Sequence, residues 1–300
     1  GYFSQHQTEE LDVTSTPYLE MYRLMEKKTG NVKESVVRAK LGQFHFSKDL
    51  ADNKISSLSG GEKARLLFAL MSYDAPHILL LNSDTVVLFR AIDRLLEFAA
   101  VEPAAGIWGG RTLFRDGSLN PSSCWQRITL WNLVCRATGL TGLFPESPTF
   151  NAEAMGGWSR DSVRRVDIVS GCFLLIRADL WRQLGGFDPS FFMYGEEADL
   201  CLRARRHGAA PMVTPAATII HLGGASETTR TAKMVKLLAA KTSLIERHMT
   251  SLERLVARPL LQLWPLSRWI ALSIAARLTR EPHQLVAARA WGEVWSRRDE

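Results

Sequence analysis

Three acidic residues, Glu196, Glu197 and Asp199, stand together where a helix is expected to begin. Apolar residues follow them at helical spacing, and the dipole of a helix N-terminus favours carboxylates in its first turn. Crowded carboxylates raise one another's pKa, which suits a group that accepts a proton near neutral pH. This cluster is therefore a candidate general base, and the alternative is an ordinary acidic first turn.

An apolar strand is expected over 79–87, and its end carries Asn82-Ser83-Asp84 directly after the apolar run 79–81. These three residues are a second candidate site. Strand ends are where α/β sheets place their ligands. Asp84 is a candidate ligand for Mg²⁺ or Mn²⁺, an ion that would offset the charge of a diphosphate. The alternative is that Asn-x-Asp forms only a turn or a helix cap.

His221 is a third candidate, because it ends the short β-branched run 218–220 and precedes a glycine-rich loop. A histidine at such a position can ligate a metal or donate to a phosphate, although a lone histidine can also be purely structural. Two further positions are candidates for substrate contacts. Ser170-Gly171 interrupts the apolar strand 166–177, and the backbone could approach a sugar there. Arg111, which follows Trp108-Gly109-Gly110, is a candidate phosphate or acceptor contact. The alternative is that Arg111 is a solvated strand residue.

The first eighty residues have a different, mainly helical pattern. Thr16-Pro17 is a cap followed by proline in the first turn of a helix, and a second helix is expected over about 32–41. Leu58-Ser59-Gly60-Gly61-Glu62 opens a third helix, with Ser59 as its N-cap. Gly60 and Gly61 allow close approach of a ligand, and free N–H groups at a helix N-terminus favour phosphate.

This stretch resembles the ATP-binding cassette proteins of the ABC-F type, which act on ribosomes. Gly1-Tyr2-Phe3-Ser4-Gln5-His6 is similar to their Q-loop, with Gln5 as its glutamine, and Leu58 to Glu62 is similar to their signature motif, including Ser59, Gly60, Gly61 and Glu62. Pro76 to Leu81 is similar to the strand that leads into Walker B. The resemblance covers roughly residues 1–81.

The same stretch departs from the cassette pattern where ATP chemistry needs it most. The sequence contains no GxxxxGK[ST] motif to hold the β- and γ-phosphates, and Asn82 and Ser83 stand where the family has acidic residues. A neutral amide holds Mg²⁺ poorly, and serine does not polarise water as a carboxylate does. ATP is therefore not expected as a cofactor, and a helical remnant or scaffold is the expected role.

Residues 78–226 resemble the family-two glycosyltransferases of the GT-A fold, and most of all the rhamnosyltransferase-like branch that builds bacterial surface polysaccharide. Four motifs carry the resemblance in the expected order: Asn82-Ser83-Asp84 for the DxD motif, 169–173 for the strand beneath the donor sugar, 195–201 for the ED motif, and His221 for the histidine that completes some metal sites. Asn82 replaces the first acid of the DxD motif, and Glu197 replaces the usual aspartate of the ED motif.

The resemblance implies an inverting transfer from a nucleoside-diphosphate sugar, with Glu197 as the base and Asp84 at a divalent metal. The acceptor would be a polysaccharide or a lipid-linked glycan. The family's N-terminal nucleotide-binding strand–helix–strand is replaced by the cassette-like segment, so we expect impaired activity. The chain begins at Gly1 without methionine and is expected to be truncated there. The alternative function is a non-catalytic scaffold, the remnant of an ABC-F protein acting at the ribosome.

Charge and composition separate the last segment from the rest. Residues 227–300 hold 13 Lys/Arg and 7 Asp/Glu, a net charge of +6, whereas the preceding residues balance. Apolar residues at helical spacing, tryptophans and arginines over 254–280 favour contact with an anionic membrane surface, although a helical cap on the catalytic domain remains the alternative. Pro259 and Pro265 are expected to break this region into short helices. The basic residues interleave with an apolar helical pattern, so nucleic acid is not an expected partner except through the ribosome.

Together these patterns predict an α/β fold in which an incomplete GT-A core is preceded by a helical cassette fragment and followed by a helical tail. The expected boundaries are 1–77, 78–226 and 227–300. Four cysteines without metal-binding spacing favour reduced core thiols, and no uncharged apolar run is long enough to span a membrane. A cytoplasmic location is expected, with peripheral contact on the inner face of the cell membrane.

Overall fold

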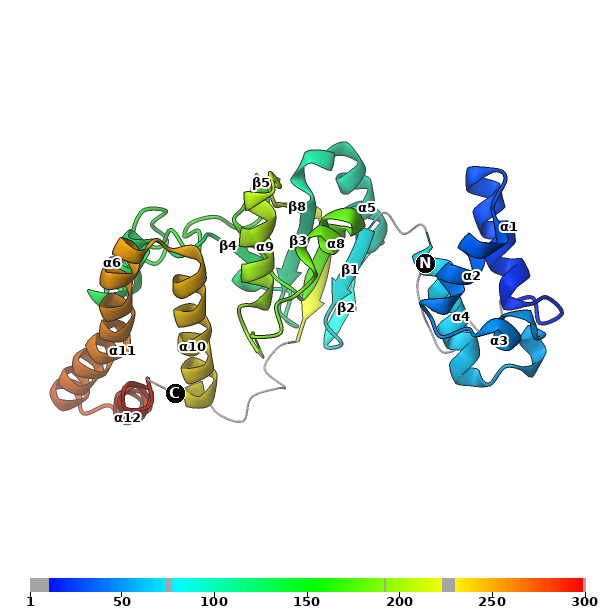
Figure 1. The fold of residues 1–300 in the computed structure, drawn as a ribbon. Helices are drawn as coiled ribbons and strands as arrows, with labels where there is room; N and C mark the ends of the chain where they lie inside the picture. The colour runs from blue at the N-terminus through cyan, green and yellow to red at the C-terminus, as the bar shows by residue number, and fades with distance from the viewer. Residues whose placement is uncertain (1–10, 74–76, 192, 223–229, 299–300) are drawn as a thin grey trace. The chain divides into compact units, whose positions relative to one another are not determined.

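The computed structural model describes residues 11–73, 77–191, 193–222 and 230–298. The chain divides into two compact units, residues 1–76 and residues 77–300. This division falls one residue before the boundary expected between the cassette-like segment and the core. The first unit is helical, whereas the second combines a mixed β-sheet with a helical tail (Figure 1).

The described part of the first unit has four α-helices: α1 Pro17–Thr29, α2 Glu34–Gly42, α3 Lys48–Asp52 and α4 Gly60–Ser72. The expected caps are present, because Oγ1 of Thr16 accepts from the backbone N–H of Leu19 at 3.2 Å and Ser59 caps α4. Met21, Leu41 and Leu66 are fully buried between these helices. The unit therefore has an apolar core of its own.

The second unit contains a six-stranded sheet in which β1 and β2 occupy opposite ends of the strand order β1-β7-β3-β8-β2, and β5 pairs with β8. Among the described strands of this sheet, β3 and β8 are parallel and the other pairs are antiparallel. A second sheet has two strands, β4 and β6. The strands are β1 His77–Leu81, β2 Thr85–Val87, β3 Ile107–Leu113, β4 Cys124–Trp125, β5 Arg164–Arg165, β6 Ile168–Val169, β7 Phe173–Arg177 and β8 Met212–His221.

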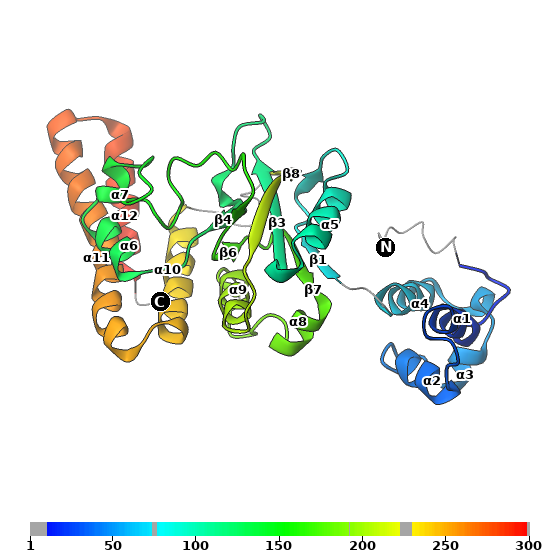
Figure 2. The same ribbon diagram turned by 90° about the horizontal axis from the view of Figure 1, so that it is seen from above.

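Helices cover both faces of the sheet (Figure 2). Helix α5, Ala91–Val101, lies on one face, and α8, Ala178–Leu184, and α9, Glu196–Arg206, lie on the other. Side chains alternate across β7, so that Phe173 packs with α5 while Leu174 packs with α8 and α9. The nearly continuous apolar run of β7 is explained by this burial on both faces.

Two segments expected to be single strands are each divided in the structure. The run 79–87 forms β1 and β2, which pair with β7 and β8 respectively, and Asn82–Asp84 crosses between them. The run 166–177 forms β6 and β7, which are separated at Ser170-Gly171-Cys172. In both cases the polar residues lie at the interruption because each half pairs with a different neighbour.

The tail forms three long helices that pack with the shorter α6 and α7. Leu133 of α6, Leu261 and Trp264 contribute to a buried cluster that joins these helices. The helices are α6 Leu130–Ala137, α7 Leu140–Leu143, α10 Arg230–His248, α11 Ser251–Thr279 and α12 Pro282–Ser296, and 3₁₀ turns occur at Ile55–Ser57, Pro103–Ala105 and Pro121–Ser123. The predicted helical tail is confirmed.

The expectation that Pro259 and Pro265 break the tail into short helices is wrong. Helix α11 runs without interruption from Ser251 to Thr279 with both prolines inside it. A proline inside a helix costs roughly 3 kcal/mol through the lost hydrogen bond and the clash with the preceding turn. Burial of Leu261 and Trp264 against α6 and α12 offsets that cost, so packing overrides the local preference.

The predicted fold class is confirmed: a mixed α/β core follows a helical segment and precedes a helical tail. All four cysteines are buried free thiols, as expected. Among the described residues, no helix is both long and apolar enough to cross a membrane.

Candidate active site

The structure brings together Asn82, Asp84 and His221 from opposite ends of the core sequence. Nε2 of His221 lies 3.2 Å from Oδ1 of Asp84 and 3.3 Å from Nδ2 of Asn82. The side chains of His221 and Asp84 are 17% and 30% exposed, so solvent and small ligands can reach them. Three residues expected to serve one metal and diphosphate site are therefore adjacent.

Strand pairing accounts for this adjacency. Thr85 of β2 stands opposite His221 at the end of β8, and the backbone N–H of Leu222 donates to the carbonyl oxygen of Asp84 at 3.0 Å. On the other side, the backbone N–H of Asn82 donates to the carbonyl oxygen of Cys172 at 3.2 Å. The Asn82–Asp84 segment is thus tied both to β8 and to the turn that precedes β7.

Glu197 lies on the other side of that turn, in the first turn of α9. A Cβ atom built on Gly171 would stand 3.7 Å from Cβ of Glu197, so the glutamate lies directly against the turn backbone. Gly195 precedes the helix with a φ of 91°, a left-handed conformation that glycine adopts without strain. This turn directs Glu196 and Glu197 toward the end of the sheet.

The carboxyl group of Glu197 is buried although the residue as a whole is half-buried. Burial, and then the negative charge of Glu196, raise the pKa of Glu197 to about 7. Its Oε2 has no hydrogen-bond partner among the described residues. A carboxylate with these properties can accept a proton at neutral pH.

Cys172 connects the two halves of the site. Burial raises the pKa of its thiol, and the charges of Glu197 and Asp84 raise it further, so both carboxylates lie close to this one residue. The backbone N–H of Cys172 donates to Oγ of Ser170 at 3.4 Å, which shapes the turn between them. The Ser170-Gly171-Cys172 turn therefore separates the proton acceptor from the Asp84–His221 pair.

Asp199 does not join this arrangement, and the expectation that the three acids all raise one another's pKa is wrong for it. Its Oδ2 accepts from Nε of Arg203 at 2.7 Å, and its Oδ1 lies 2.8 Å from Nε2 of His248. Burial alone would raise the pKa of Asp199, but the hydrogen bonds from His248 and Arg203 lower it. Both oxygens face away from Glu197 into a structural ion pair, because α9 turns Asp199 toward α10.

Sequence reasoning missed three residues that hold the site in place: Arg203, Arg247 and His248. Arg203 donates from Nη1 and Nη2 to the carbonyl oxygens of Leu184 and Gly186, each at 2.8 Å. Arg247 of α10 pairs with Asp188 and donates to Oγ of Ser190 at 2.7 Å in the loop before α9. Helix α10 thus braces the loop that ends at Gly195. The Arg203–Asp199 pair has the i,i+4 spacing of a helical ion pair and could have been found in the sequence. The contacts of Arg247 and His248 could not, because their partners are 49 to 59 residues apart.

Arg111 lies on β3 opposite Thr218, immediately after a register shift in the β3–β8 pairing. It is half-buried, and its Nε is buried without a hydrogen-bond partner among the described residues. Gly110 precedes it with no room for a side chain, since a Cβ atom there would stand 2.4 Å from the carbonyl oxygen of Ala217. No hydrogen bond joins Arg111 to Asp84, His221 or Glu197 in the described structure. Its role as a phosphate or acceptor contact stays a prediction.

The donor atoms around His221 fit part of a divalent metal site. Oxygen and imidazole ligands about 2.1 Å from an octahedral ion stand about 3 Å apart, close to the observed separation of Oδ1 and Nε2. Nδ1 of His221 is buried without a partner among the described residues. No group of three or more His, Cys, Asp or Glu side chains in the described ranges could hold a metal. Asp84 and His221 are therefore two candidate metal ligands, with Asn82 beside them.

The cassette-like motif of the first unit forms the N-terminus of α4. Oγ of Ser59 and the carboxylate of Glu62 hydrogen-bond reciprocally with the backbone, at 3.4 and 2.8 Å, in a capping box. Apart from the adjoining residues and the helix's own backbone, no atom of the described structure lies within 4 Å of a Cβ built on Gly60 or Gly61, so this end of the helix is open to a ligand. Gln5, like Gly223 after the site histidine, lies outside the described residues.

Comparisons with known proteins identify both parts of the chain. Residues 49–242 match the family described as "Glycosyltransferase like family 2". A segment of the chain is 40% identical over 98 residues to "ABC transporter F family member 4" of Arabidopsis thaliana, which is 32% of this chain and 14% of that protein. It is also 40% identical over 85 residues to "Probable ATP-binding protein YheS" of Haemophilus influenzae, which is 28% of this chain and 13% of that protein.

One solved structure with a similar trace is the mannosyltransferase PcManGT from Pyrobaculum calidifontis in complex with GDP-Man and Mn²⁺. The TM-score is 0.42 at 12% identity, covering 90% of this chain and 74% of that chain. A similarity of this size assigns neither a fold nor a ligand. The chain spans about one seventh of the length of the curated ABC-F relatives it matches.

The resemblances to family-two glycosyltransferases and to ABC-F proteins, both predicted from sequence motifs, are thus confirmed. The family match begins at residue 49, inside the helical segment, and includes the whole Asn82–Asp84, Ser170–Cys172, Glu197 and His221 arrangement. It extends over well more than half of the chain. The chain therefore belongs to the glycosyltransferase-like family 2.

Proposed function

We propose that this protein is a metal-dependent, inverting glycosyltransferase that uses a nucleoside-diphosphate sugar. The observation that carries the proposal is that a buried carboxyl group with a pKa of about 7 and an Asp–His pair flank the same turn. Family membership supports glycosyl transfer as the reaction class. A glycan or lipid-linked sugar is the proposed acceptor, and hexosyl or rhamnosyl transfer is the proposed specificity.

Glu197 acts as the general base in this proposal. Its carboxylate takes the proton from an acceptor hydroxyl, and that oxygen bonds to the anomeric carbon as the bond to the diphosphate breaks. Attack from the side opposite the leaving group inverts the anomeric centre. Ser170-Gly171 supports the sugar, because a residue without a side chain at 171 leaves its backbone open beside Glu197.

Asp84 and His221 are the proposed ligands of Mg²⁺ or Mn²⁺. Bound there, a divalent ion would offset the negative charge of the leaving diphosphate. Asn82 occupies a place beside the pair where its amide can hydrogen-bond a phosphate oxygen. Arg111 is proposed as a further phosphate or acceptor contact.

Metal binding and catalysis can be tested separately on the full chain. Electron paramagnetic resonance of free Mn²⁺ reports binding without any turnover, and we expect Asp84→Asn to weaken binding at least tenfold. Asp93→Asn, a surface carboxylate on α5 that pairs with Arg90, is the matched control and should leave binding unchanged. Equal Mn²⁺ binding by the Asp84 variant and the wild type would contradict the assignment.

Turnover is measured as nucleoside diphosphate released from GDP-, UDP- and dTDP-sugars in Mn²⁺. Loss of a general base costs about 10²–10⁴-fold in rate, so Glu197→Gln should lose at least a hundredfold while Mn²⁺ binding is kept. Retained turnover would remove Glu197 from its role. Asp199→Asn should change turnover mainly through stability, because its carboxylate is engaged with Arg203 and His248.

A second candidate function is supported by the ABC-F match and by the open N-terminus of α4. In it the protein is a non-catalytic scaffold that docks at the ribosome through the first unit. ATP hydrolysis is not part of this proposal, because the sequence lacks a P-loop. This function predicts that the protein co-sediments with ribosomes but not with liposomes. The Gly61→Asp variant should no longer co-sediment with ribosomes.

We also propose that α11 contacts a membrane surface. Eight of its large apolar residues are more than a third exposed. Six of these recur at spacings that place them on one face of the helix: Leu252, Leu255, Val256, Leu263, Ile270 and Ile274. Arg254 and Arg258 bond to Met249 and Glu246, whereas Arg277 and Arg280 are exposed near the end of the helix. The location at the inner face of the cell membrane stays a prediction.

A further inference from the structure

The loop before α9 ends in two left-handed residues, directly ahead of the glutamates. Of this loop, 187–195, residues 187–191 and 193–195 are described. Tyr194 has a φ of 66° and Gly195 a φ of 91°. The left-handed conformation is unfavourable for a residue with a Cβ atom, so a tyrosine keeps it only where surrounding contacts hold the backbone. The contacts that hold this loop therefore also set where α9 begins.

Gly195 fits between the ring of Phe191 and helix α10. A Cβ atom built on Gly195 would stand 3.1 and 3.2 Å from Cδ1 and Cε1 of Phe191, and 3.4 Å from Cβ of Ala240 in α10. Phe191 and Ala240 are themselves buried. The position of Gly195 therefore depends on where the Phe191 ring and α10 lie.

The backbone of Gly195 acts on the carboxyl group of Glu197. Burial is the largest influence on the pKa of Glu197 and raises it, and the charge of Glu196 raises it further. The backbone N–H groups of Gly171 and Gly195 lower this pKa, because hydrogen bonds to a carboxylate favour its charged form. Gly171 belongs to the turn before β7, so a shift of the loop would remove the Gly195 N–H and leave that of Gly171 in place.

Arg247, in the last turn of α10, holds the same loop at three points. Its guanidinium pairs with the carboxylate of Asp188 and donates from Nη2 to Oγ of Ser190 at 2.7 Å. It also lies over the Phe191 ring, 5.1 Å from the ring centre, where a cation is attracted to the aromatic face. One side chain of the tail thus contacts three of the four residues of the turn 188–191.

The turn 188–191 is also closed by its own hydrogen bonds. Oδ1 of Asp188 accepts from the backbone N–H of Ser190 at 2.9 Å, and the carbonyl oxygen of Asp188 accepts from the backbone N–H of Phe191 at 3.1 Å. Hydrogen bonds from Ser190 and then from Arg247 lower the pKa of Asp188 to about 2, so its charge is present near neutral pH. The turn therefore moves as one piece, and Arg247 attaches that piece to α10.

We propose that Arg247 is a positioning residue for Glu197. The inference rests on the proposed function, because Glu197 is the general base of that reaction. Arg247 holds the turn 188–191, the Phe191 ring holds Gly195, and the N–H of Gly195 meets the carboxyl group. A helix of the tail thereby sets the position of the base.

The other titratable groups that face Glu197 belong to the core. Glu196 lies beside it, Cys172 faces it from the turn before β7, and Cys201 lies one helical turn further along α9. Burial raises the pKa of both thiols, that of Cys201 to about 12, so neither ionises near neutral pH. No hydrogen bond or ion pair within the described ranges joins Arg247 to these groups, so its effect on Glu197 passes through the loop.

Titration of the Glu197 carboxyl group tests this chain of contacts without turnover. The full chain is labelled with carboxyl carbon-13 glutamate and followed by NMR from pH 5 to 9, and the Glu197 signal is the one that Glu197→Gln removes. Arg247→Met should raise the pKa of Glu197 by about 0.5–1 pH unit, because one hydrogen bond to the carboxylate is lost. An unchanged or lower pKa would overturn the proposal.

Two variants separate positioning from a direct effect of charge. Ser190→Ala removes a loop contact without changing any charge, and it should raise the pKa of Glu197 by less than Arg247→Met does. Arg247→Lys keeps the charge but lacks the planar fork that reaches two partners, so it should restore only part of the shift. A wild-type pKa in both variants would show that only the charge acts, and it would refute the positioning role.

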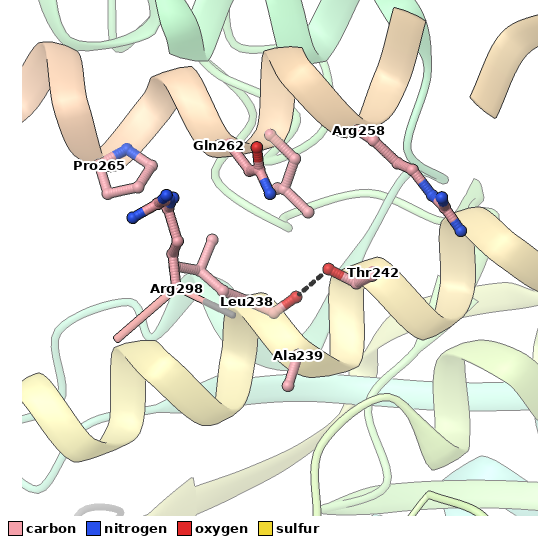
Figure 3. Close-up of a pocket in the computed structure, with 8 residues that line it drawn as sticks. Leu238, Ala239, Thr242, Arg258, Gln262, Pro265 and Arg298 are labelled. Atoms are coloured by element: carbon pink, nitrogen blue, oxygen red, sulfur yellow. Dashed lines mark hydrogen bonds between the residues drawn. The ribbon is translucent and has the colours of Figure 1, made fainter. Parts of the chain in front are cut away.

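Arg258→Met is the matched control for a loosened tail. Arg258 pairs with Glu246 beside a cavity of about 340 Å³ between α10 and α11 (Figure 3). No hydrogen bond or ion pair of the described structure joins Arg258 to the loop 187–195. This variant loses an ion pair of the same kind, but it should leave the pKa of Glu197 unchanged. A shift as large as that of Arg247→Met would contradict the proposal.

Turnover shows what the positioning contributes to transfer. Misplacing a reacting group by about 1 Å can cost on the order of a hundredfold in rate. At pH 9, where Glu197 is ionised in both proteins, kcat per folded molecule should fall at least tenfold in Arg247→Met, with KM for the donor changed less than twofold. A wild-type kcat in this variant would refute the role of Arg247 in the reaction.

The two proposals fail separately. If the pKa of Glu197 responds to Arg247→Met and Ser190→Ala but the wild type transfers no sugar from any donor, the contact chain stands and the proposed function falls. If the wild type transfers sugar and Arg247→Met changes neither the pKa nor kcat, the proposed function stands and the positioning role is refuted.

Discussion

Replacing Glu197 with glutamine should stabilise the folded second unit at and above neutral pH while abolishing sugar transfer. Burial and the charge of Glu196 raise the pKa of Glu197 from 4.5 in the unfolded chain to about 7. A carboxyl group whose pKa is raised by folding holds its proton more tightly in the folded state. Stability that is fully present below pH 4.5 is therefore lost as the pH rises through 7.

The size of the effect follows from the shift. At 1.36 kcal/mol per pH unit, a rise from 4.5 to about 7 amounts to about 3 kcal/mol of unfolding free energy at pH 8. Glutamine does not ionise, so the stability difference between variant and wild type should grow from near zero at pH 4.5 to this value. For a unit of this size, 1 kcal/mol shifts the melting temperature by about 2–4 °C, which predicts roughly 6–12 °C.

Scanning calorimetry between pH 5 and 8, without metal or nucleotide, measures this difference. Contributions from titrating groups that do not interact with Glu197 cancel, because they are shared by the two proteins. Asp199→Asn is the matched control: it should be less stable than the wild type throughout this pH range, because its partners lower the pKa of Asp199 below 3.8 and the charged carboxylate stabilises the fold. A Glu197→Gln variant whose stability relative to wild type does not change with pH, or falls as pH rises, would refute the buried-base assignment.

Two further predictions concern packing and membrane contact. Gly110→Ala should destabilise the second unit by about 1–3 kcal/mol in urea unfolding, because its Cβ atom would stand 2.4 Å from the carbonyl oxygen of Ala217. The control Gly61→Ala meets open space in α4 and should not destabilise the protein. If Gly110→Ala had no effect on stability, strand β3 would have to shift freely to accommodate the added methyl group. The double variant Leu255→Glu/Ile274→Glu should lose flotation with anionic phosphatidylglycerol vesicles that wild type binds, and unchanged flotation would rule out α11 as the contact face.

The local features of the fold could be predicted because they depend on neighbouring residues alone. Thr16 and Ser59 cap their helices through their own side chains. Asn82–Asp84 and Ser170-Gly171 mark the site because they place polar or small residues inside otherwise apolar strands, which indicates a structural or functional role. The motif order then indicated the family.

The division of the expected strands could not be predicted in the same way. An apolar run has the same pattern whether one neighbour or two pair with it, so β1 and β2 could be separated only by their pairing with β7 and β8. The continuity of α11 through Pro259 and Pro265 has a similar origin. Burial of α11 against α6 and α12 stabilises the helix and offsets the unfavourable helix propensity of the two prolines.

The amino-acid sequence by itself determined which residues can do chemistry: an Asp and a His at two strand ends, and a pair of glutamates at a helix start. Tertiary structure decided which of them meet and which do not. It placed Glu197 in a buried position that raises its pKa, and it turned Asp199, two residues away, toward Arg203 and His248, which lower its pKa. The physical reason is that a carboxyl group's proton affinity depends on burial and on nearby charge, and both are set by elements distant in the chain.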